Sequence, residues 1–234
     1  MYKIQYNKET SEQYGLVFNG YPSVSYPEDR MNTETVRYRD GDLIAGDPSY
    51  GNVEITCPFS LIVTEPREWE LQFRKVKKWI RGRNDQKLSF TFEQDRYYMV
   101  KKAMIDSAER ELGRYGTMDV TFSCYPYKYV VGGDHVLEDY KFVYNPYDIA
   151  HPVYRIRGEG ICRLTVNGRS IQANIAQSLV INTELQIAYR LDGVDRNTAV
   201  NGDYEEIYLI PGSNRITITD GFELEVIPMW RELI

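Results

Sequence analysis

Apolar and polar residues alternate along most of this chain, in short runs that end at glycine, proline, asparagine or aspartate. Such alternation is typical of strands with one buried face, because successive side chains of a strand point to opposite sides of the sheet. In the first half, the pattern predicts strands at Thr33–Tyr38, Val53–Val63, Lys87–Phe92, Tyr97–Ile105 and Tyr115–Tyr125.

One segment of the first half has a helical period instead. Its apolar residues recur at spacings of four, three and four, which places them on one helix face: Trp69, Phe73, Val76 and Ile80. Pro66 suits the first helical turn and Gly82 suits a helix end. We therefore expect a helix over about residues 66–81.

From His151 onward the pattern predicts strands alone, at short and regular spacing: Val153–Arg157, Ile161–Val166, Arg169–Ile175, Leu179–Ile181, Gln186–Tyr189, Glu205–Ile210, Asn214–Thr219 and Phe222–Ile227. Asn167-Gly168 predicts a type I′ hairpin turn, because both residues tolerate positive φ. Pro211-Gly212 predicts a type II turn. This pattern favours an all-β sandwich.

The break between the halves predicts two domains. Gly132-Gly133-Asp134 ends the first series of strands, and a polar stretch follows to about Ala150. We expect a first domain over residues 1–135, a linker over residues 136–150 and a second domain over residues 151–234.

The segment Tyr21–Tyr50 is too long for an idle connection in a compact domain, and residues 39–51 are expected to form a loop or a protruding hairpin. One interpretation is an arm that extends onto another subunit. The candidate contact residues of this arm are Tyr21, Tyr26, Tyr38, Leu43, Ile44 and Tyr50. A flexible surface loop remains an equal alternative.

Composition and charge narrow the possible partners. The chain of 234 residues is 42% hydrophobic and 26% charged, as in ordinary soluble proteins, and its formal net charge of −6 argues against tight binding of nucleic acid. The cations that crowd the helix are interpreted as a solvated outer face: Arg74, Lys75, Lys77 and Lys78. The sequence contains neither a membrane-spanning run nor a signal peptide, so we expect synthesis in a cytoplasm and no membrane contact.

The residue types that hold metals or cofactors are sparse. Cys57, Cys124 and Cys162 are expected to be buried, reduced thiols. His135 and His151 have no Cys or His at ligand spacing, and Gly158-Glu159-Gly160 reads as a backbone bend rather than a nucleotide loop. We therefore expect no metal site and no cofactor.

Paired carboxylates are the remaining candidates for catalysis, since glycosidases use two acids at a set separation. The candidate groups are Asp192 with Asp195, Asp203 with Glu205 and Glu206, and Glu223 with Glu225. Solvated loop and strand acids explain all three groups more simply. We expect a protein without catalytic residues, with a glycan hydrolase as the weakest alternative.

The order of several motifs carries more information than any one of them. A Trp-bearing helix, WELQFRKVKKWIRG, precedes DRYYMVKKAM and a strand that ends in VTFSCYPYKY. HPVYRIRGEGICRLTVNG, YEEIYLIPGSNRITI and MWREL then follow in the second half. In this order, and over nearly the whole chain, the sequence resembles the distal tail protein (Dit) family of long-tailed phages and prophages of Gram-positive bacteria.

The resemblance implies an N-terminal β-sandwich-like domain with one helix, and a C-terminal sandwich like a galectin or a carbohydrate-binding module. It implies a homo-oligomeric ring, usually of six subunits, at the hub of the tail tip in the virion, assembled in the host cytoplasm. The implied partners are the tail-tube protein, the tail-associated lysin or fibre protein and a receptor-binding protein. DNA would pass through the central channel without specific binding.

A binding module of a phage baseplate, for carbohydrate or for a receptor, is the alternative function. Tyr189, Tyr204 and Tyr208 could stack on a sugar in the second domain. Packing within the sheet is the plainer role of strand tyrosines, and both interpretations stay open at this point.

Overall fold

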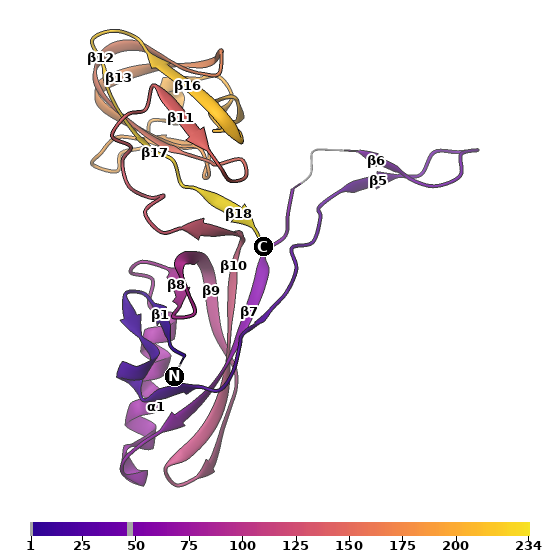
Figure 1. The fold of residues 1–234 in the computed structure, drawn as a ribbon, viewed down its shortest axis with the longest axis vertical. Coiled ribbons are helices and arrows are strands. Elements are labelled where there is room, and N and C mark those ends of the chain that lie inside the picture. Colours follow the sequence, from indigo (N-terminus) through magenta and orange to yellow (C-terminus); the bar gives the residue numbers. More distant parts are fainter. Residues whose placement is uncertain (1, 46–48) are drawn as a thin grey trace. The chain divides into compact units, whose positions relative to one another are not determined.

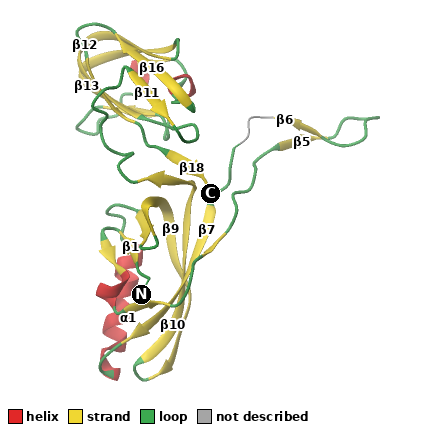
Figure 2. Cartoon of the chain, in the orientation of Figure 1, coloured by secondary structure: helices red, strands yellow, loops and turns green. Residues whose placement is uncertain are grey.

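The structure, a computed structural model, describes residues 2–45 and 49–234 and is mainly β, with one α-helix in the part of the chain described (Figures 1 and 2). The predicted mainly β fold class is therefore confirmed, while the likeness of the second domain to a galectin or a carbohydrate-binding module stays a prediction. Two units divide the chain: Met1–Lys128 together with Leu233–Ile234, and Tyr129–Glu232. The last two residues thus return to the first unit, where the Ile234 N–H donates to the Pro126 carbonyl.

The first unit is organised by a nine-stranded sheet with the order β2-β1-β8-β9-β10-β7-β3, in which β4 pairs with β7 and β18 with β10. The strands of this sheet are β1 (Ile4–Tyr6), β2 (Glu9–Thr10), β3 (Leu16–Phe18), β4 (Ser23–Val24), β7 (Val53–Ile62), β8 (Lys87–Phe90), β9 (Glu93–Leu112), β10 (Tyr115–Val130) and β18 (Arg231–Leu233). Of β18, only Leu233 belongs to the first unit. A separate pair, β5 (Asn32–Glu34) and β6 (Leu43–Ala45), lies within the predicted arm. The predicted strands are confirmed, although Thr33–Tyr38 is shorter and β9 and β10 are longer than expected.

The predicted helix forms. A 3-10 turn over Pro66–Glu68 leads into α1 (Trp69–Arg81). Gly82 follows α1 with φ −61° and ψ 148°, so the helix ends by a return to extended backbone and not by a left-handed cap. The Asn7 side chain stabilises this exit, because its Nδ2 donates to the Gly82 carbonyl at 2.7 Å.

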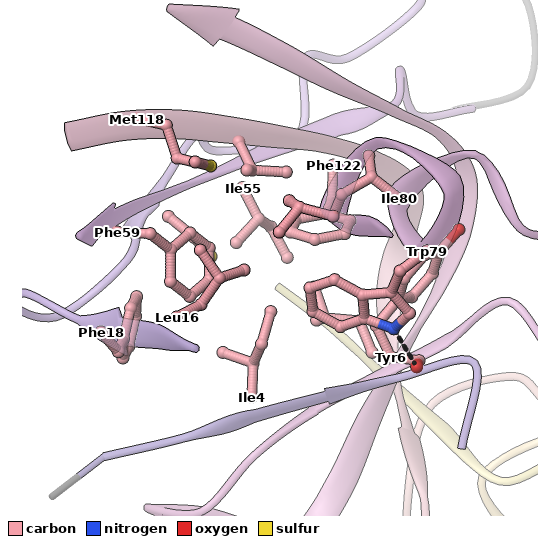
Figure 3. Close-up of a cluster of buried hydrophobic side chains, with 14 of the residues drawn as sticks. Ile4, Tyr6, Leu16, Phe18, Ile55, Phe59, Trp79, Ile80, Met118 and Phe122 are labelled. Carbon is pink, nitrogen blue, oxygen red and sulfur yellow. Dashed lines mark hydrogen bonds between the residues drawn. The ribbon is translucent and has the colours of Figure 1, made fainter. Parts of the chain in front are cut away.

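The apolar face of α1 covers one side of the long sheet. Val76, Trp79 and Ile80 are buried there, and Figure 3 shows Trp79 and Ile80 beside Phe122 of β10. The Trp79 Nε1–H donates to the Tyr6 carbonyl at 3.0 Å, which satisfies a donor that would otherwise be buried without a partner. The cysteines of this unit, Cys57 and Cys124, are buried as predicted, and burial raises the pKa of the Cys124 thiol to about 12.

The second unit is organised by a seven-stranded sheet with the order β11-β16-β12-β13-β14, in which β15 pairs with β13 and β17 with β12. Its strands are β11 (Phe142–Asn145), β12 (Val153–Val166), β13 (Arg169–Asn182), β14 (Ile187–Tyr189), β15 (Val200–Asn201), β16 (Gly212–Ile218) and β17 (Glu223–Ile227). Short 3-10 turns lie at Ser11–Tyr14 in the first unit, and at Asn197–Ala199 and Tyr204–Ile207 in the second.

The longest hairpin of the second unit joins pieces that the sequence pattern separated. Strands β12 and β13 pair from Val153↔Asn182 to Val166↔Arg169. The turn between them has φ 53° at Asn167 and φ 85° at Gly168, as a type I′ turn requires. Gly158 and Gly160 have positive φ inside β12, so they bend the strand without ending it.

One predicted strand of the second unit is wrong. Residues 205–210 do not form a strand; Tyr204–Ile207 is a 3-10 turn, followed by an isolated bridge between Leu209 and Ala150. Ile207 is fully buried in this turn, and its carbonyl accepts a hydrogen bond from the Tyr154 hydroxyl at 2.7 Å. The apolar residues were therefore correctly predicted as core, but they reach it from a turn.

The two units differ from the predicted domains at both boundaries. The first unit ends at Lys128, and the predicted linker 136–150 contains β11, which pairs with β16 from Phe142↔Arg215 to Asn145↔Gly212. Val143 and Asn145 of β11 are buried. A short strand with only one buried apolar side chain has too little alternation to stand out in the sequence.

A substitution at Gly116 would test the packing at the start of α1. A Cβ at this position would lie 2.3 Å from the Glu109 carbonyl oxygen and 2.4 Å from the Trp69 ring. We expect Gly116→Ala to lower the free energy of unfolding by about 1–3 kcal/mol, the usual cost of overpacking. Urea unfolding would measure the change.

Gly20→Ala is the matched control, because a Cβ at Gly20 meets no atom within 4 Å. Equal midpoints for the two variants would contradict the packing described at Trp69.

Candidate assembly site

The arm, defined as residues 21–50, begins on the sheet of the first unit. Strand β4 pairs with β7 through Ser23↔Thr56 and Val24↔Ile55. The Ser25 N–H then donates to the Glu54 carbonyl at 3.0 Å. The base of the arm is therefore a continuation of the sheet.

Beyond this base the arm is a two-stranded ribbon. Gly51 N donates to Glu28 O at 2.8 Å, and Arg30 N donates to Ser49 O at 2.6 Å. Strands β5 and β6 extend the ribbon with the register Thr33↔Ile44, and Figure 1 shows the two strands side by side. The predicted protruding hairpin is thus present, while residues 46–48 of the predicted loop lie outside the described residues.

No side chain of the arm is buried in the part of the chain described. Tyr26 is 85% exposed, Ile44 is 64% exposed and Tyr38, at φ 64°, is fully exposed. An isolated two-stranded ribbon is marginally stable in water, because it has no third layer in which to bury apolar groups. The ribbon therefore presents apolar side chains that a second surface could cover.

The predicted arm residues fall into two groups. Tyr21 and Tyr50 pack on the first unit: the Tyr21 ring lies 5.3 Å from that of Phe92, and the Tyr50 ring lies 6.4 Å from that of Tyr127. The other residues point to solvent: Tyr26, Tyr38, Leu43 and Ile44. Met31 and Val36 are exposed on the same ribbon and were not predicted, although their apolar character within a polar stretch was the available signal.

The candidate acid pairs are engaged locally. Arg190 forms an ion pair with Asp192 and holds the pKa of that carboxyl at about 2. Asp195 accepts the Asn197 N–H at 2.9 Å, in a turn. These contacts are those of turn residues.

The third candidate pair is also paired with cations. Glu225 lies 3.6 Å from Arg155 and 3.4 Å from Arg157 across β17 and β12. Within residues 2–45 and 49–234, no cluster of three or more His, Cys, Asp or Glu side chains is arranged to hold a metal ion.

The candidate sugar-stacking tyrosines do not share one open face. The Tyr208 ring is stacked on His151 at 3.8 Å, and Tyr204 packs against the core of the second unit. Sequence reasoning missed Phe142 and Tyr144, which are 72% and 69% exposed on one face of β11. Their alternation with Val143 and Asn145 was the signal, hidden by their place in the expected linker.

A buried polar cluster joins distant segments of the second unit around Arg231, whose side chain is 3% exposed. Its Nε donates to the Ile149 carbonyl at 2.8 Å, and its Nη1 lies 2.6 Å from Glu184. Its Nη2 lies 2.7 Å from His151 Nε2. Because a guanidinium can only donate, Nε2 is the acceptor and the imidazole proton sits on Nδ1, which lies 2.7 Å from Glu184.

The charge of His151 follows from this geometry. Burial and, to a lesser degree, Arg231 lower the pKa of His151, against the opposing effect of Glu184 and Glu205. A second proton on Nε2 would face the guanidinium directly. The neutral imidazole is therefore the form that fits the folded unit.

The lowered pKa of His151 predicts a pH dependence of stability. The unfolded chain binds a proton near the ordinary histidine value of about 6.5, while the folded unit binds it only at lower pH. The stabilisation is thus fully present above pH 6.5 and is lost as the pH falls below that value. We expect His151→Gln to flatten this part of the profile in urea unfolding between pH 7.5 and 5.

His135→Gln is the control, because that side chain is 81% exposed. A profile that His151→Gln leaves unchanged would contradict the assignment of the proton to this cluster.

No described helix is long and apolar enough to span a membrane. No curated protein matches the chain in sequence. A family model described as a phage tail protein RIFT-related domain matches residues 10–124, which form most of the first unit.

Two solved structures share the fold over the whole chain. The Dit protein of phage SPP1, described as a paradigm of the hub adsorption apparatus in phages that infect Gram-positive bacteria, has a TM-score of 0.65 and 14% identity, covering 100% of this chain and 99% of that chain. The activated, Ca-containing baseplate of phage P2 contains a chain with a TM-score of 0.50 and 12% identity, covering 100% and 98%. The chain therefore contains a phage tail protein RIFT-related domain over residues 10–124 and has the fold of the distal tail proteins, the family that its ordered motifs resemble.

Proposed function

We propose that the protein is the structural hub of a phage tail tip. Copies of the chain form a ring, hexameric as the family resemblance implies, around a channel through which DNA passes. One side of the ring binds the tail-tube protein, and the other binds the tail-associated lysin or fibre protein. A receptor-binding protein of the baseplate is a further partner.

The arm carries this proposal. The described side chains of the ribbon are not buried, and a ribbon whose apolar residues face solvent gains most of its stability when another surface covers it. In a head-to-tail interface the arm of each copy lies on the next copy, and such interfaces close into rings when the rotation between subunits allows it. The arm therefore suits the repeated contact of a ring.

The comparisons support the same role. SPP1 Dit is described as belonging to a hub adsorption apparatus, and the P2 structure is a baseplate. The net charge of −6 suits a protein past which DNA slides, because a negative surface repels phosphates and disfavours sticking.

A substitution at Ile44 would test whether the arm contributes to assembly. Its side chain is 64% exposed, so Ile44→Asp leaves the folded unit intact but places a carboxylate in the proposed contact. We expect the concentration at which half of the protein is assembled to rise by about tenfold or more, since burying an unpaired charge in an interface is costly. Light scattering and negative-stain electron microscopy, which should show an annulus for the unaltered chain, would measure this.

Ile161→Asp is the matched control, because Ile161 is 65% exposed in the second unit and outside the arm. A strictly monomeric wild-type protein, alone and on the end of purified tail tubes, would overturn the ring.

One observation favours a second function in the second unit. Phe142 and Tyr144 stand two residues apart on the exposed face of β11, and the Arg215 guanidinium lies 5.8 Å from the Phe142 ring. An adjoining groove of about 420 Å³ is lined in part by Arg215 and Asp220. Exposed aromatic faces beside polar groups suit a sugar ring, so this surface is the candidate carbohydrate-binding site of the alternative function.

Binding of the full chain to host cell walls and to a glycan array tests this second function. We expect Phe142→Ala with Tyr144→Ala to reduce any retained glycan signal by about tenfold, the effect of losing one or two stacking contacts. Tyr26→Ala is the control, since Tyr26 is equally open but lies on the arm. A wild-type protein that binds no glycan and no cell wall would remove this function and leave the hub proposal untouched.

A further inference from the structure

The charge of this chain is strongly segregated. Residues 69–83 carry one carboxylate, Glu70, and six cations: Arg74, Lys75, Lys77, Lys78, Arg81 and Arg83. This short segment has a net charge of +5, so the rest of a chain of net charge −6 carries −11. We call the surface formed by these six cations the basic face.

The basic face is not neutralised by the fold. In the part of the chain described, none of its six cations forms an ion pair; the Arg74 Nε donates to the Glu70 carbonyl, and the Lys77 Nζ lies 4.7 Å from the Phe73 ring centre. Five of the six line an open groove of about 940 Å³, whose wall includes Tyr14 stacked on Trp79 at 4.8 Å and 15°. A solvated face alone does not require such a concentration of one sign, because like charges three and four residues apart on a helix repel each other.

The same unit has a surface of opposite sign on the other side of its sheet. We call it the carboxylate face, and it consists of Glu54 on β7, Glu111 on β9 and Asp119 on β10. Asp119 alternates with the buried Met118 and Val120, and Glu54 alternates with buried neighbours in the same way. These carboxylates therefore point away from the core that α1 covers.

The partners of the carboxylate face are hydroxyls. Thr117 donates to Glu111 at 2.9 Å, and Ser107 donates to Asp119 at 3.4 Å. Among the described residues, no cation forms an ion pair with any of the three carboxylates. Hydroxyl partners satisfy hydrogen bonds but leave the negative charge in place.

The two faces point in opposite directions, because α1 packs on the core side of the sheet and these carboxylates alternate with the core residues. We propose that the basic face of one copy docks on the carboxylate face of the next copy. This inference rests on the proposed function, since it assigns a second contact to the ring that the arm already implies. Two complementary surfaces on opposite sides of one unit are what a head-to-tail interface requires.

The proposed partner of the basic face is a second copy of the chain and not a nucleic acid. The helix has 13 residues, so it is about 20 Å long. A polyanion longer than that would extend beyond the basic segment, and the rest of the chain carries a net charge of −11. A protein face of limited size meets only the basic segment. Charge complementarity of this kind sets the orientation and rate of association more than its final affinity, and it weakens with salt.

A charge-reversal series on the full-length protein tests the docking. Lys75 and Lys78 are exposed on α1 and contribute nothing to its buried face. We expect Lys75→Glu with Lys78→Glu to raise the half-assembly concentration by about tenfold, because like charges then face each other across the interface. The neutral pair Lys75→Gln with Lys78→Gln should give a smaller rise, and the wild-type protein should assemble less readily as NaCl increases.

The matched control is Arg163→Glu with Arg169→Glu, which makes the same charge change at exposed positions of the second unit. Circular dichroism and urea unfolding verify that each variant is folded. In the helix-reversed protein, Glu54→Lys with Asp119→Lys should restore assembly, since the signs of both faces are then exchanged.

Each other outcome overturns the inference. Assembly unchanged by helix reversal removes the basic face from the ring and leaves the hub function intact, because the wild-type rings are still formed. If helix reversal abolishes assembly and Glu54→Lys with Asp119→Lys does not restore it, the basic face binds a surface other than the carboxylate face. If the wild-type protein binds double-stranded DNA tightly and helix reversal abolishes this binding, the partner of the basic face is a nucleic acid. If the wild-type chain never assembles, both the hub function and the docking are wrong.

Discussion

The packing of α1 against one face of the long sheet is the constraint on which the first unit depends. Trp79 is 3% exposed, its ring is edge-on to Tyr6 at 6.0 Å, and its Nε1–H is tied to the Tyr6 backbone. Once this face is covered, every charged residue of α1 must point outward, and every polar residue that alternates with the core of β7 and β10 must point to the opposite side. Both charged faces thus follow from a single packing contact.

The arm follows from the opposite condition, a lack of buried partners. The core side chains are covered by contacts within the unit, and Ile4, Ile55 and Phe59 are fully buried. Along the arm the ribbon keeps its backbone hydrogen bonds, but Tyr26, Tyr38 and Ile44 are exposed to solvent. Ordering such a segment costs conformational entropy that contacts within the unit do not offset, so an intermolecular contact accounts best for its apolar residues.

Much of the fold could be predicted from the sequence because its signals are local. The helical period of α1 and the Asn167-Gly168 turn depend on residues that are close in the chain, and the structure contains both. The strand predicted at residues 205–210 failed because burial of Ile207 looks the same in sequence whether a strand or a 3-10 turn delivers it. The spacing of apolar residues alone does not distinguish a short strand from a short helical turn.

The sites were harder to predict because they depend on residues far apart in the chain. The partners of Arg231 lie 47 and 80 positions away, at Glu184 and His151, so neither spacing nor motif indicates their meeting. The arm could be located by its length, but which of its tyrosines anchor it and which face solvent is decided by Phe92 and Tyr127. The basic cluster on α1 was visible in the sequence, whereas the absence of ion pairs to it among the described residues was not.

In the proposed contact between copies, the arm and the charged faces have different tasks. Apolar area on the arm supplies affinity, but apolar contact is not directional and would also permit two copies to pair by a two-fold axis. A symmetric contact of two basic faces would place +5 against +5, and a contact of two carboxylate faces would repel in the same way. Segregated charge therefore acts against closed dimers and leaves the head-to-tail arrangement, the one that can be repeated until a ring closes.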